Sequence, residues 1–566
     1  MGLDIPHGAP AAAMALLIAV SVAGLAGCGG GSGSGASPTT AASTPLVGGG
    51  SAFHPSGVTI ETTTRAPRTS LARVTWDEPY GEPTSLDPLK ARGLSENTVL
   101  ANTCDALQRT GPDLSLQPGL ATSWTHPTPT TTVFKIRAGV RFWDGAPMTV
   151  GDVVYSLRRH LDPRLGTRYR AWVNDIQSIA QTGPDKITLT TKIPDVLVAQ
   201  MMSTGLGTVI EQRYAEARGS AYGSPAGGLM CTGPFELSSW TRGRQIVLRR
   251  NPAYWDEALE PRVQTLVFKF ITDPTKLIEA LTAGRIDGTY EVPIAGIPRL
   301  ASLGSIYAGL STSQEILQPL QSTGLDANWR IRKALSFGIE RTSIIQSVLH
   351  EVAVPELFPI PPDSFAYATQ RFRTWWLAAD TPVPRHGGPA RTFVVEAGEP
   401  KATMTIGIEQ GDLQSLAVAQ AVRGAAAEIG LKMAVARLPR ARYEALMFSK
   451  AARRGIDWTI GRAAYLDQAE PLQAFFYWGL SNSSYNFDGF KDPHADSLFA
   501  EARAQADPQL RAPLAIRALQ RWVRTVNNIP LYISPELLFM NNTITGAPTS
   551  LPTFLYYPWA AMLGGA

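Results

Sequence analysis

Strand-like and helix-like segments alternate along residues 71–566, and this alternation limits the fold more than any other feature of the sequence. Apolar and polar residues alternate, as in half-buried strands, at 71–76, 132–137, 186–190, 246–248 and 263–271. Between these segments, apolar residues recur with helical spacing at 150–160, 274–283, 329–349, 415–429 and 508–526. The Pro- and Gly-rich segment 361–389 predicts a loop. Because no short internal period is present, a solenoid is excluded and a mixed α/β fold is predicted.

The N-terminal segment is not expected to join this fold. The apolar run from Ala11 to Ala26 leads to Cys28, and small residues before a cysteine after such a run are typical of a signal-peptide cleavage site. We expect residues 1–27 to be a signal peptide, Cys28 to carry lipid, and residues 28–69 to form a flexible tether on the outer face of the plasma membrane. An uncleaved membrane anchor is the alternative, because the apolar run is nearly long enough to span a bilayer.

The composition suits a soluble globular protein with more than one core, since 44% of the 566 residues are hydrophobic and 17% are charged. The formal net charge of +4 is small for this length, so it argues for neither a nucleic-acid partner nor a membrane-surface partner. No second apolar run of about 18 residues follows the first, so no further membrane span is predicted.

Two cysteines remain besides Cys28. Cys104 and Cys231 are expected in a compartment where disulfides persist, and either a bridge or two separately buried thiols fits the sequence. A bridge would close a loop of about 127 residues and would stabilise the fold by about 4 to 5 kcal/mol through the entropy of the unfolded chain. No second Cys or His stands at ligand spacing near either cysteine, so no metal site is predicted.

The motifs of common enzymes are absent. The chain has no His-Glu-x-x-His, no phosphate-binding Gly-x-x-x-x-Gly-Lys-Ser/Thr and no Gly-x-Ser-x-Gly on a strand-to-helix turn. We therefore predict a protein that is not an enzyme and that carries neither a metal nor a cofactor.

A series of motifs resembles the solute-binding proteins of peptide-type ABC importers, the family 5 oligopeptide- and dipeptide-binding lipoproteins. The motifs that carry the resemblance, by their order and spacing, lie at 85–88, 91–97, 116–124, 133–137, 140–149, 152–157, 232–235, 247–255, 283–288 and 330–336. Among them are Ser85-Leu86-Asp87-Pro88 and Thr232-Gly233-Pro234-Phe235. Most of these residues are interpreted as turns that hold the fold and do not touch the ligand.

The resemblance implies the two-lobed, type II periplasmic-binding-protein fold with an extra inserted subdomain. It assigns residues 70–297 and 518–566 to lobe I, with the subdomain inserted at about 90–216, and residues 298–517 to lobe II. The chain would cross between the lobes near residues 291–293 and 514–519. Ligand would lie in the cleft, and the lobes would close around it by a hinge motion.

The resemblance also implies where a ligand binds. Peptide-binding relatives pair an extended ligand with two backbone segments, as an added strand does. The first segment corresponds to Arg92, Gly93 and Leu94, and the second, registered on Glu470-Pro471, to Ala463, Ala464 and Tyr465. Asp467 would accept the α-amino group of the ligand through a charge-assisted hydrogen bond, and Tyr485 would lie at the cleft edge.

Two positions depart from the family pattern. Ala464 stands where a Trp is usual and Gln468 where a Tyr is usual, so the side-chain pocket is expected to be wider or to hold something other than a short peptide. The alternative for Asp467 is a solvated loop carboxylate, and the alternative for Arg92 is an exposed cation with no ligand contact.

The function implied is capture of oligopeptides outside the cell and delivery to two ABC permease subunits and their two ATPases. The protein is expected to act as a monomer. Relatives with this fold also carry haem, metal chelates or glycans, so a non-peptide solute is one alternative. A non-transport, regulatory envelope lipoprotein is another. No histidine lies in the two predicted site segments, so haem and metal chelates are less favoured as ligands.

Overall fold

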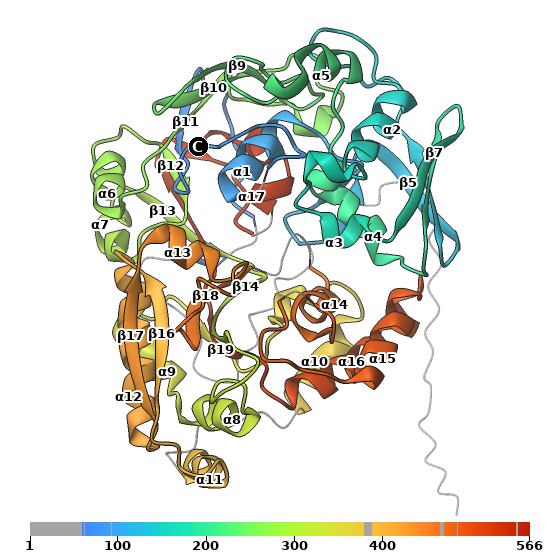
Figure 1. The fold of residues 1–566 in the computed structure, drawn as a ribbon. Coiled ribbons are helices and arrows are strands. Elements are labelled where there is room, and N and C mark those ends of the chain that lie inside the picture. Colours follow the sequence, from blue (N-terminus) through green and yellow to red (C-terminus); the bar gives the residue numbers. More distant parts are fainter. Residues whose placement is uncertain are drawn as a thin grey trace, which may run out of the picture. The chain divides into compact units, whose positions relative to one another are not determined.

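The computed structural model describes residues 59–60, 63–91, 93–378, 388–464, 469–483, 485–550 and 553–566. All of them belong to one compact unit, Pro45–Ala566. The unit is a mixed α/β fold built on three larger sheets (Figure 1). The predicted signal peptide 1–27, Cys28 and most of the predicted tether lie outside the described residues.

The first sheet has eight strands in the order β1-β13-β20-β12-β2-β11-β10-β9. The strands are β1 (Thr59–Ile60), β2 (Val74–Asp77), β9 (Phe235–Thr241), β10 (Gln245–Arg250), β11 (Thr265–Lys269), β12 (Gly288–Tyr290), β13 (Gly304–Gly309) and β20 (Glu536–Asn541). The central strand β2 is parallel to β11 and to β12. Its Trp76 is fully buried and packs against the rings of Tyr290 and Trp559, so β2 lies at the centre of this core.

Short helices accompany the first sheet. They are α1 (Leu94–Thr103), α6 (Pro274–Thr282), α7 (Ile297–Leu300) and α17 (Thr553–Tyr556). Helix α6 begins after Asp273, whose carboxylate accepts from the N–H of Lys276, and it has Pro274 in its first turn. Both features favour helix initiation, which explains why the predicted start is correct. A two-stranded ribbon, β21 (Ile544–Thr545) with β22 (Gly564–Gly565), ends the chain.

The second sheet has six strands in the order β15-β19-β14-β18-β16-β17. The strands are β14 (Ser313–Pro319), β15 (Val354–Pro355), β16 (Thr403–Glu409), β17 (Lys432–Leu438), β18 (Trp458–Ala464) and β19 (Ile529–Ile533). It shares a hydrophobic core with α8 (Trp329–Gly338), α9 (Arg341–Val348), α11 (Gly388–Glu396) and α12 (Leu413–Glu428). Helix α13 (Arg440–Ala445) follows β17.

The third sheet is a four-stranded antiparallel sheet in the order β5-β6-β8-β7. Its strands are β5 (Ala121–Thr128), β6 (Thr131–Ile136), β7 (Ile176–Gly183) and β8 (Lys186–Thr191). The same region carries the ribbon of β3 (Gln108–Thr110) and β4 (Leu116–Pro118) and the helices α2 (Val150–Arg159), α3 (Arg170–Val173), α4 (Leu197–Gln200) and α5 (Gln212–Arg218). It forms one hydrophobic cluster with α10 (Thr369–Ala378), α14 (Pro471–Ala474), α15 (Pro493–Arg503) and α16 (Pro508–Val523).

The chain passes between the first and second sheets at 310–312, between β13 and β14, and at 534–535, between β19 and β20. These positions differ from the predicted crossings near 291–293 and 514–519. After β12 the chain remains in the first sheet, because β13 pairs with β20 along its whole length. Strand order, which depends on pairing between distant segments, sets these positions.

Several motif residues hold the fold together. Cys104 and Cys231 form a disulfide, with their Cα atoms 5.0 Å apart. The neighbouring Asp105 is buried and accepts hydrogen bonds from Arg109, Tyr254, Trp255 and Thr232. These contacts join the end of α1 to the segments before and after β9 and β10.

Candidate functional site

The described edge of strand β18 is the clearest site for an extended ligand. One edge of β18 pairs with β14 along its whole length, from Trp458 opposite Pro319 to Ala464 opposite Ser313. On the other edge, β16 pairs only with Trp458 and Thr459. Within the described part of the chain, no strand pairs with this edge beyond Thr459. Unpaired backbone groups at a strand edge are suited to strand addition.

The predicted second segment therefore lies partly on this edge. Ala463 and Ala464 are the last two residues of β18. Tyr465, Asp467 and Gln468 lie outside the described residues, so the predicted anchor remains a prediction.

Glu470, which registers the segment, is described and is 3% exposed. Its carboxylate accepts from the N–H of Leu472, 3.1 Å away, and from the hydroxyl of Tyr367, 3.0 Å away. Burial raises the pKa of Glu470, and the positive charge of Arg511 opposes this effect. Glu470 therefore caps helix α14, and the acidic-Pro pair has a structural role.

The predicted first segment lies at a helix start. Arg92 is outside the described residues, Gly93 is the N-cap of α1 and Leu94 is its first residue. The N–H of Gly93 donates to Glu96, 2.9 Å away, which also accepts from the N–H of Thr84. The Gly93 N–H is thus used within the protein.

Tyr485 is half-buried within a group of aromatic rings. Its ring lies 6.0 to 6.3 Å from those of Tyr477, Trp478, Phe448 and Phe487. Burial raises the pKa of the Tyr485 hydroxyl, and the charge of Arg168 opposes this effect.

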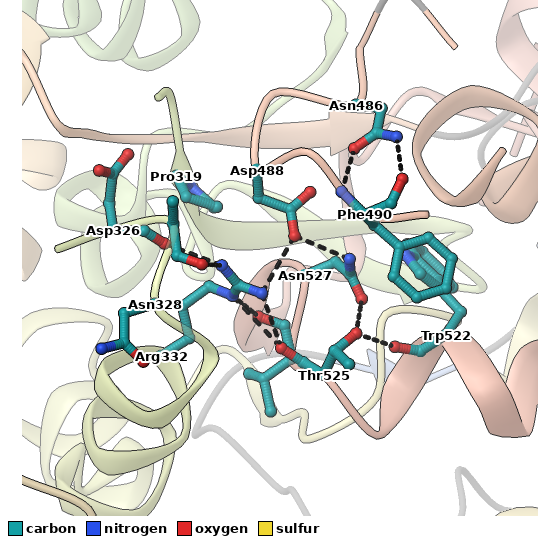
Figure 2. A network of polar contacts seen from close by, with 12 residues as sticks. Pro319, Asp326, Asn328, Arg332, Asn486, Asp488, Phe490, Trp522, Thr525 and Asn527 are labelled. Atoms are coloured by element: carbon teal, nitrogen blue, oxygen red, sulfur yellow. Dashed lines mark hydrogen bonds and ion pairs between the residues drawn. The ribbon is translucent and has the colours of Figure 1, made fainter. Parts of the chain in front are cut away.

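The loop after Tyr485 is held by a polar network (Figure 2). Asp488 pairs with Arg332 at 3.1 Å and accepts from Asn527 at 2.8 Å, and the side chain of Asn486 bonds the backbone of Phe490 at both polar atoms. Burial raises the pKa of Asp488, and the Arg332 guanidinium opposes this effect. The network ties the loop to α8 and to the end of α16, which fixes the position of Tyr485.

Contacts between the four-stranded sheet region and α14–α16 were not predicted. The Nε1–H of Trp172 donates to the hydroxyl of Tyr477 at 3.0 Å, and the Trp172 ring stacks on Phe476 at 4.3 Å. Arg503 pairs with Asp195, which is fully buried, and also with Asp175. The aromatic run Phe475-Phe476-Tyr477-Trp478 is visible in the sequence. Its partner Trp172 lies 305 residues before Tyr477 along the chain, so only the structure reveals this contact.

A cavity of about 1130 Å³ lies elsewhere, between α8, α10 and α16. Trp375 and Trp522 are among its lining residues, and none of the predicted site residues is. Among the described residues, no helix is long and apolar enough to cross a membrane, and no group of three or more His, Cys, Asp or Glu side chains is arranged to hold a metal ion.

Solved structures share the fold of this chain. AgaA from A. tumefaciens R10, in complex with agropinic acid, is 20% identical with a TM-score of 0.73, and the match covers 87% of this chain and 98% of that one. OppA from Haemophilus influenzae, in complex with the peptide RPPGFSPFR, is 20% identical with a TM-score of 0.71, covering 88% of this chain and all of the other. The chain therefore has the fold of the periplasmic solute-binding proteins.

Sequence similarity identifies the family. The periplasmic oligopeptide-binding protein OppA of Salmonella typhimurium is 23% identical over 486 residues, covering 79% of this chain and 84% of that protein. Residues 115–487 match the family described as "Bacterial extracellular solute-binding proteins, family 5 Middle". Because this match spans more than half of the chain, the protein belongs to that family, as the motifs predicted.

Proposed function

We propose that this protein is a lipid-anchored receptor that captures oligopeptides outside the plasma membrane and delivers them to an ABC importer. The observation that carries the proposal is the edge of β18 beyond Thr459, which no described strand covers. An extended peptide on this edge would pair its backbone with residues 461–464, so the site would accept varied sequences.

The end of the peptide would be fixed by Asp467, three residues beyond β18. A buried carboxylate that accepts from an ammonium group contributes about 1.5–3 kcal/mol. The same carboxylate left unpaired is costly, so ligands without the positive charge would be rejected. Arg92 and Leu94 would contact the ligand from the other lobe.

The two lobes would close on the ligand through the crossings at 310–312 and 534–535. At the first crossing, the N–H of Ser311 donates to the carboxylate of Asp363 at 3.0 Å. This contact offers a fixed point about which the backbone of the neighbouring residues can rotate. We propose these crossings as the hinges in place of 291–293 and 514–519.

A non-peptide solute is the second candidate. Ala464 removes the usual Trp from the ligand segment, and one structural neighbour, AgaA, is in complex with agropinic acid. The wider pocket expected at Ala464 would suit such a solute.

Anchoring by lipid on Cys28, transfer to permease subunits and their ATPases, and a monomeric state belong to the same proposal. The protein would bind its solute without chemical change.

Native mass spectrometry of residues 45–566, purified from rich medium, tests the proposal. These residues form one compact unit with its own cores. We expect copurified masses that match a ladder of short peptides, together with thermal stabilisation by peptide mixtures. Asp467→Ala should abolish both, whereas Asp185→Ala, a partly exposed acid in the β7–β8 turn, should change neither. An empty protein that peptides do not stabilise would refute the peptide proposal and favour another solute.

A further inference from the structure

One short segment of the chain beside β18 is strongly basic. Residues 437–454 contain six Lys or Arg and one Glu, a net charge of +5, whereas the entire chain carries +4. The remainder of the protein is therefore close to neutral, and the small overall charge conceals a strongly basic region. The segment comprises the end of β17, helix α13 and the turns that follow it. We call it the basic segment.

The basic segment lies beside the open edge of β18. The hydroxyl of Tyr443 in α13 donates to the carbonyl of Ile460 in β18 at 2.7 Å. A Cβ atom on the next residue, Gly461, would lie 3.3 Å from the same hydroxyl oxygen. Figure 1 shows α13 next to β18. Further along, the ring of Phe448 contacts that of Tyr485 at 6.3 Å. The segment thus flanks the site from the β18 edge to the aromatic group.

Most of its charges face solvent. The exposed cations are Arg437, Arg440, Arg442, Lys450 and Arg454. Phe448, which lies in the same segment, is 78% exposed.

Acidic side chains neutralise only part of this charge. Arg440 pairs with Glu444 at 2.8 Å, and the charge of Glu409 also acts on it. Burial raises the pKa of the Tyr443 hydroxyl, and the nearby carboxylates of Glu315, Asp412 and Glu409 raise it further, which places these acids on the α13 side. Within the described residues, no ion pair involves Lys450 or Arg454.

From this juxtaposition we infer that the ligands are acidic peptides, drawn to the β18 edge by Lys450, Arg454 and their basic neighbours. This inference rests on the proposed function, since it concerns the same strand edge. Alternate side chains of an added strand point to the same face, so acidic residues at every second position would place their charges together. Salt at about 0.15 M screens exposed charges over about 8 Å, so the attraction between these cations and an acidic ligand should be strongest at low salt.

Two matched peptides, Ala-Glu-Ala-Glu-Ala and Ala-Lys-Ala-Lys-Ala, test the inference. Their affinities for residues 45–566 would be measured by isothermal titration calorimetry at low salt and at about 0.15 M salt. We expect the acidic peptide to bind about tenfold more tightly at low salt, with a smaller difference at the higher salt. The double change Lys450→Glu/Arg454→Glu should remove or invert this preference.

The control reverses the same number of charges elsewhere on the second sheet. Arg391→Glu/Arg423→Glu alters exposed residues of α11 and α12, and it should leave the preference unchanged. Equal binding of the two peptides, or equal effects of the two double variants, would overturn the inference while the peptide function stands. If neither these peptides nor a peptide mixture binds, the proposed function fails and the inference fails with it.

Discussion

Replacing Arg503 by Met is expected to lower the free energy of unfolding by about 3–5 kcal/mol, because it leaves a buried carboxylate without its partner. The Arg503 side chain is 9% exposed, and that of Asp195 is fully buried. Loss of the second, more exposed partner, Asp175, should add little. Met retains the apolar stem of Arg503, so lost packing contributes only a small part of the change.

A double variant separates the charge from the packing. Asp195→Asn keeps an acceptor for the N–H of Leu197, which donates to Asp195 at 3.0 Å, but removes the charge. The pair Asp195→Asn/Arg503→Met should therefore lose only about 1–2 kcal/mol, about 2–3 kcal/mol less than Arg503→Met alone. Urea unfolding of residues 45–566, followed by tryptophan fluorescence and by far-ultraviolet circular dichroism, measures these values where the two transitions coincide.

The loss of unfolding free energy in Arg503→Met, its stability deficit, should also depend on pH. Burial raises the pKa of Asp195, and the charge of Arg503 opposes this effect, so the variant has a still higher pKa. A carboxyl whose pKa is raised by folding destabilises the protein as the pH rises above the pKa of the unfolded state, and this cost disappears where the carboxyl is protonated in both states. The deficit should shrink as pH falls from neutrality toward the ordinary pKa of aspartate, about 4. If the single and double variants unfold alike at neutral pH, the reasoning is refuted.

Three further predictions concern other contacts. Trp172→Phe should lower the free energy of unfolding by about 0.5–1.5 kcal/mol through loss of the hydrogen bond to Tyr477. Urea titrations should show that adding Tyr477→Phe to this variant causes no further loss, and additive losses from the two changes would contradict the role of the hydrogen bond. Cys104→Ala/Cys231→Ala should lose about 5 kcal/mol, for a loop of 127 residues; an unchanged urea midpoint would exclude a stabilising bridge. Burial raises the pKa of Glu356 to about 8 from 4.5. Glu356→Gln should therefore be more stable than the native protein above pH 8, and thermal denaturation should show that this advantage shrinks toward pH 4.5. A difference in stability that does not change with pH would contradict the raised pKa of Glu356.

Elements with strong local signals were predicted correctly. The strands at 132–137 and 186–190 correspond to β6 and β8, and the helices at 150–160 and 274–283 to α2 and α6. In β6, Thr132, Phe134 and Ile136 are buried while the residues between them are more exposed, because one face of the strand packs on the core.

Two local predictions were wrong because a distant contact decided the outcome. The single helix predicted at 329–349 is divided into α8 and α9 at Ile339, where the backbone is extended. The buried guanidinium of Arg341 donates to the carbonyls of Ser336 and Ile339, and also to that of Pro530 in the neighbouring strand β19. These bonds satisfy carbonyls that the ended helix leaves free.

The second error is the loop predicted at 361–389, which contains α10. Pro and Gly flank this helix, so its sequence gives a weak helical signal. Phe372 and Trp375 are buried in the cluster shared with the four-stranded sheet, and this packing stabilises the helix.

The sequence by itself determined the α/β class, the family and the two segments on which a ligand is predicted to bind, because these depend on short-range periodicity and on ordered motifs. Only the tertiary structure decided where the chain crosses between sheets, that one edge of β18 lacks a strand partner beyond Thr459, and that the basic segment lies beside it. Each of these features arises from pairing between residues far apart in the chain. Such pairing depends on burial and hydrogen bonding in three dimensions, and no local pattern in the sequence records it.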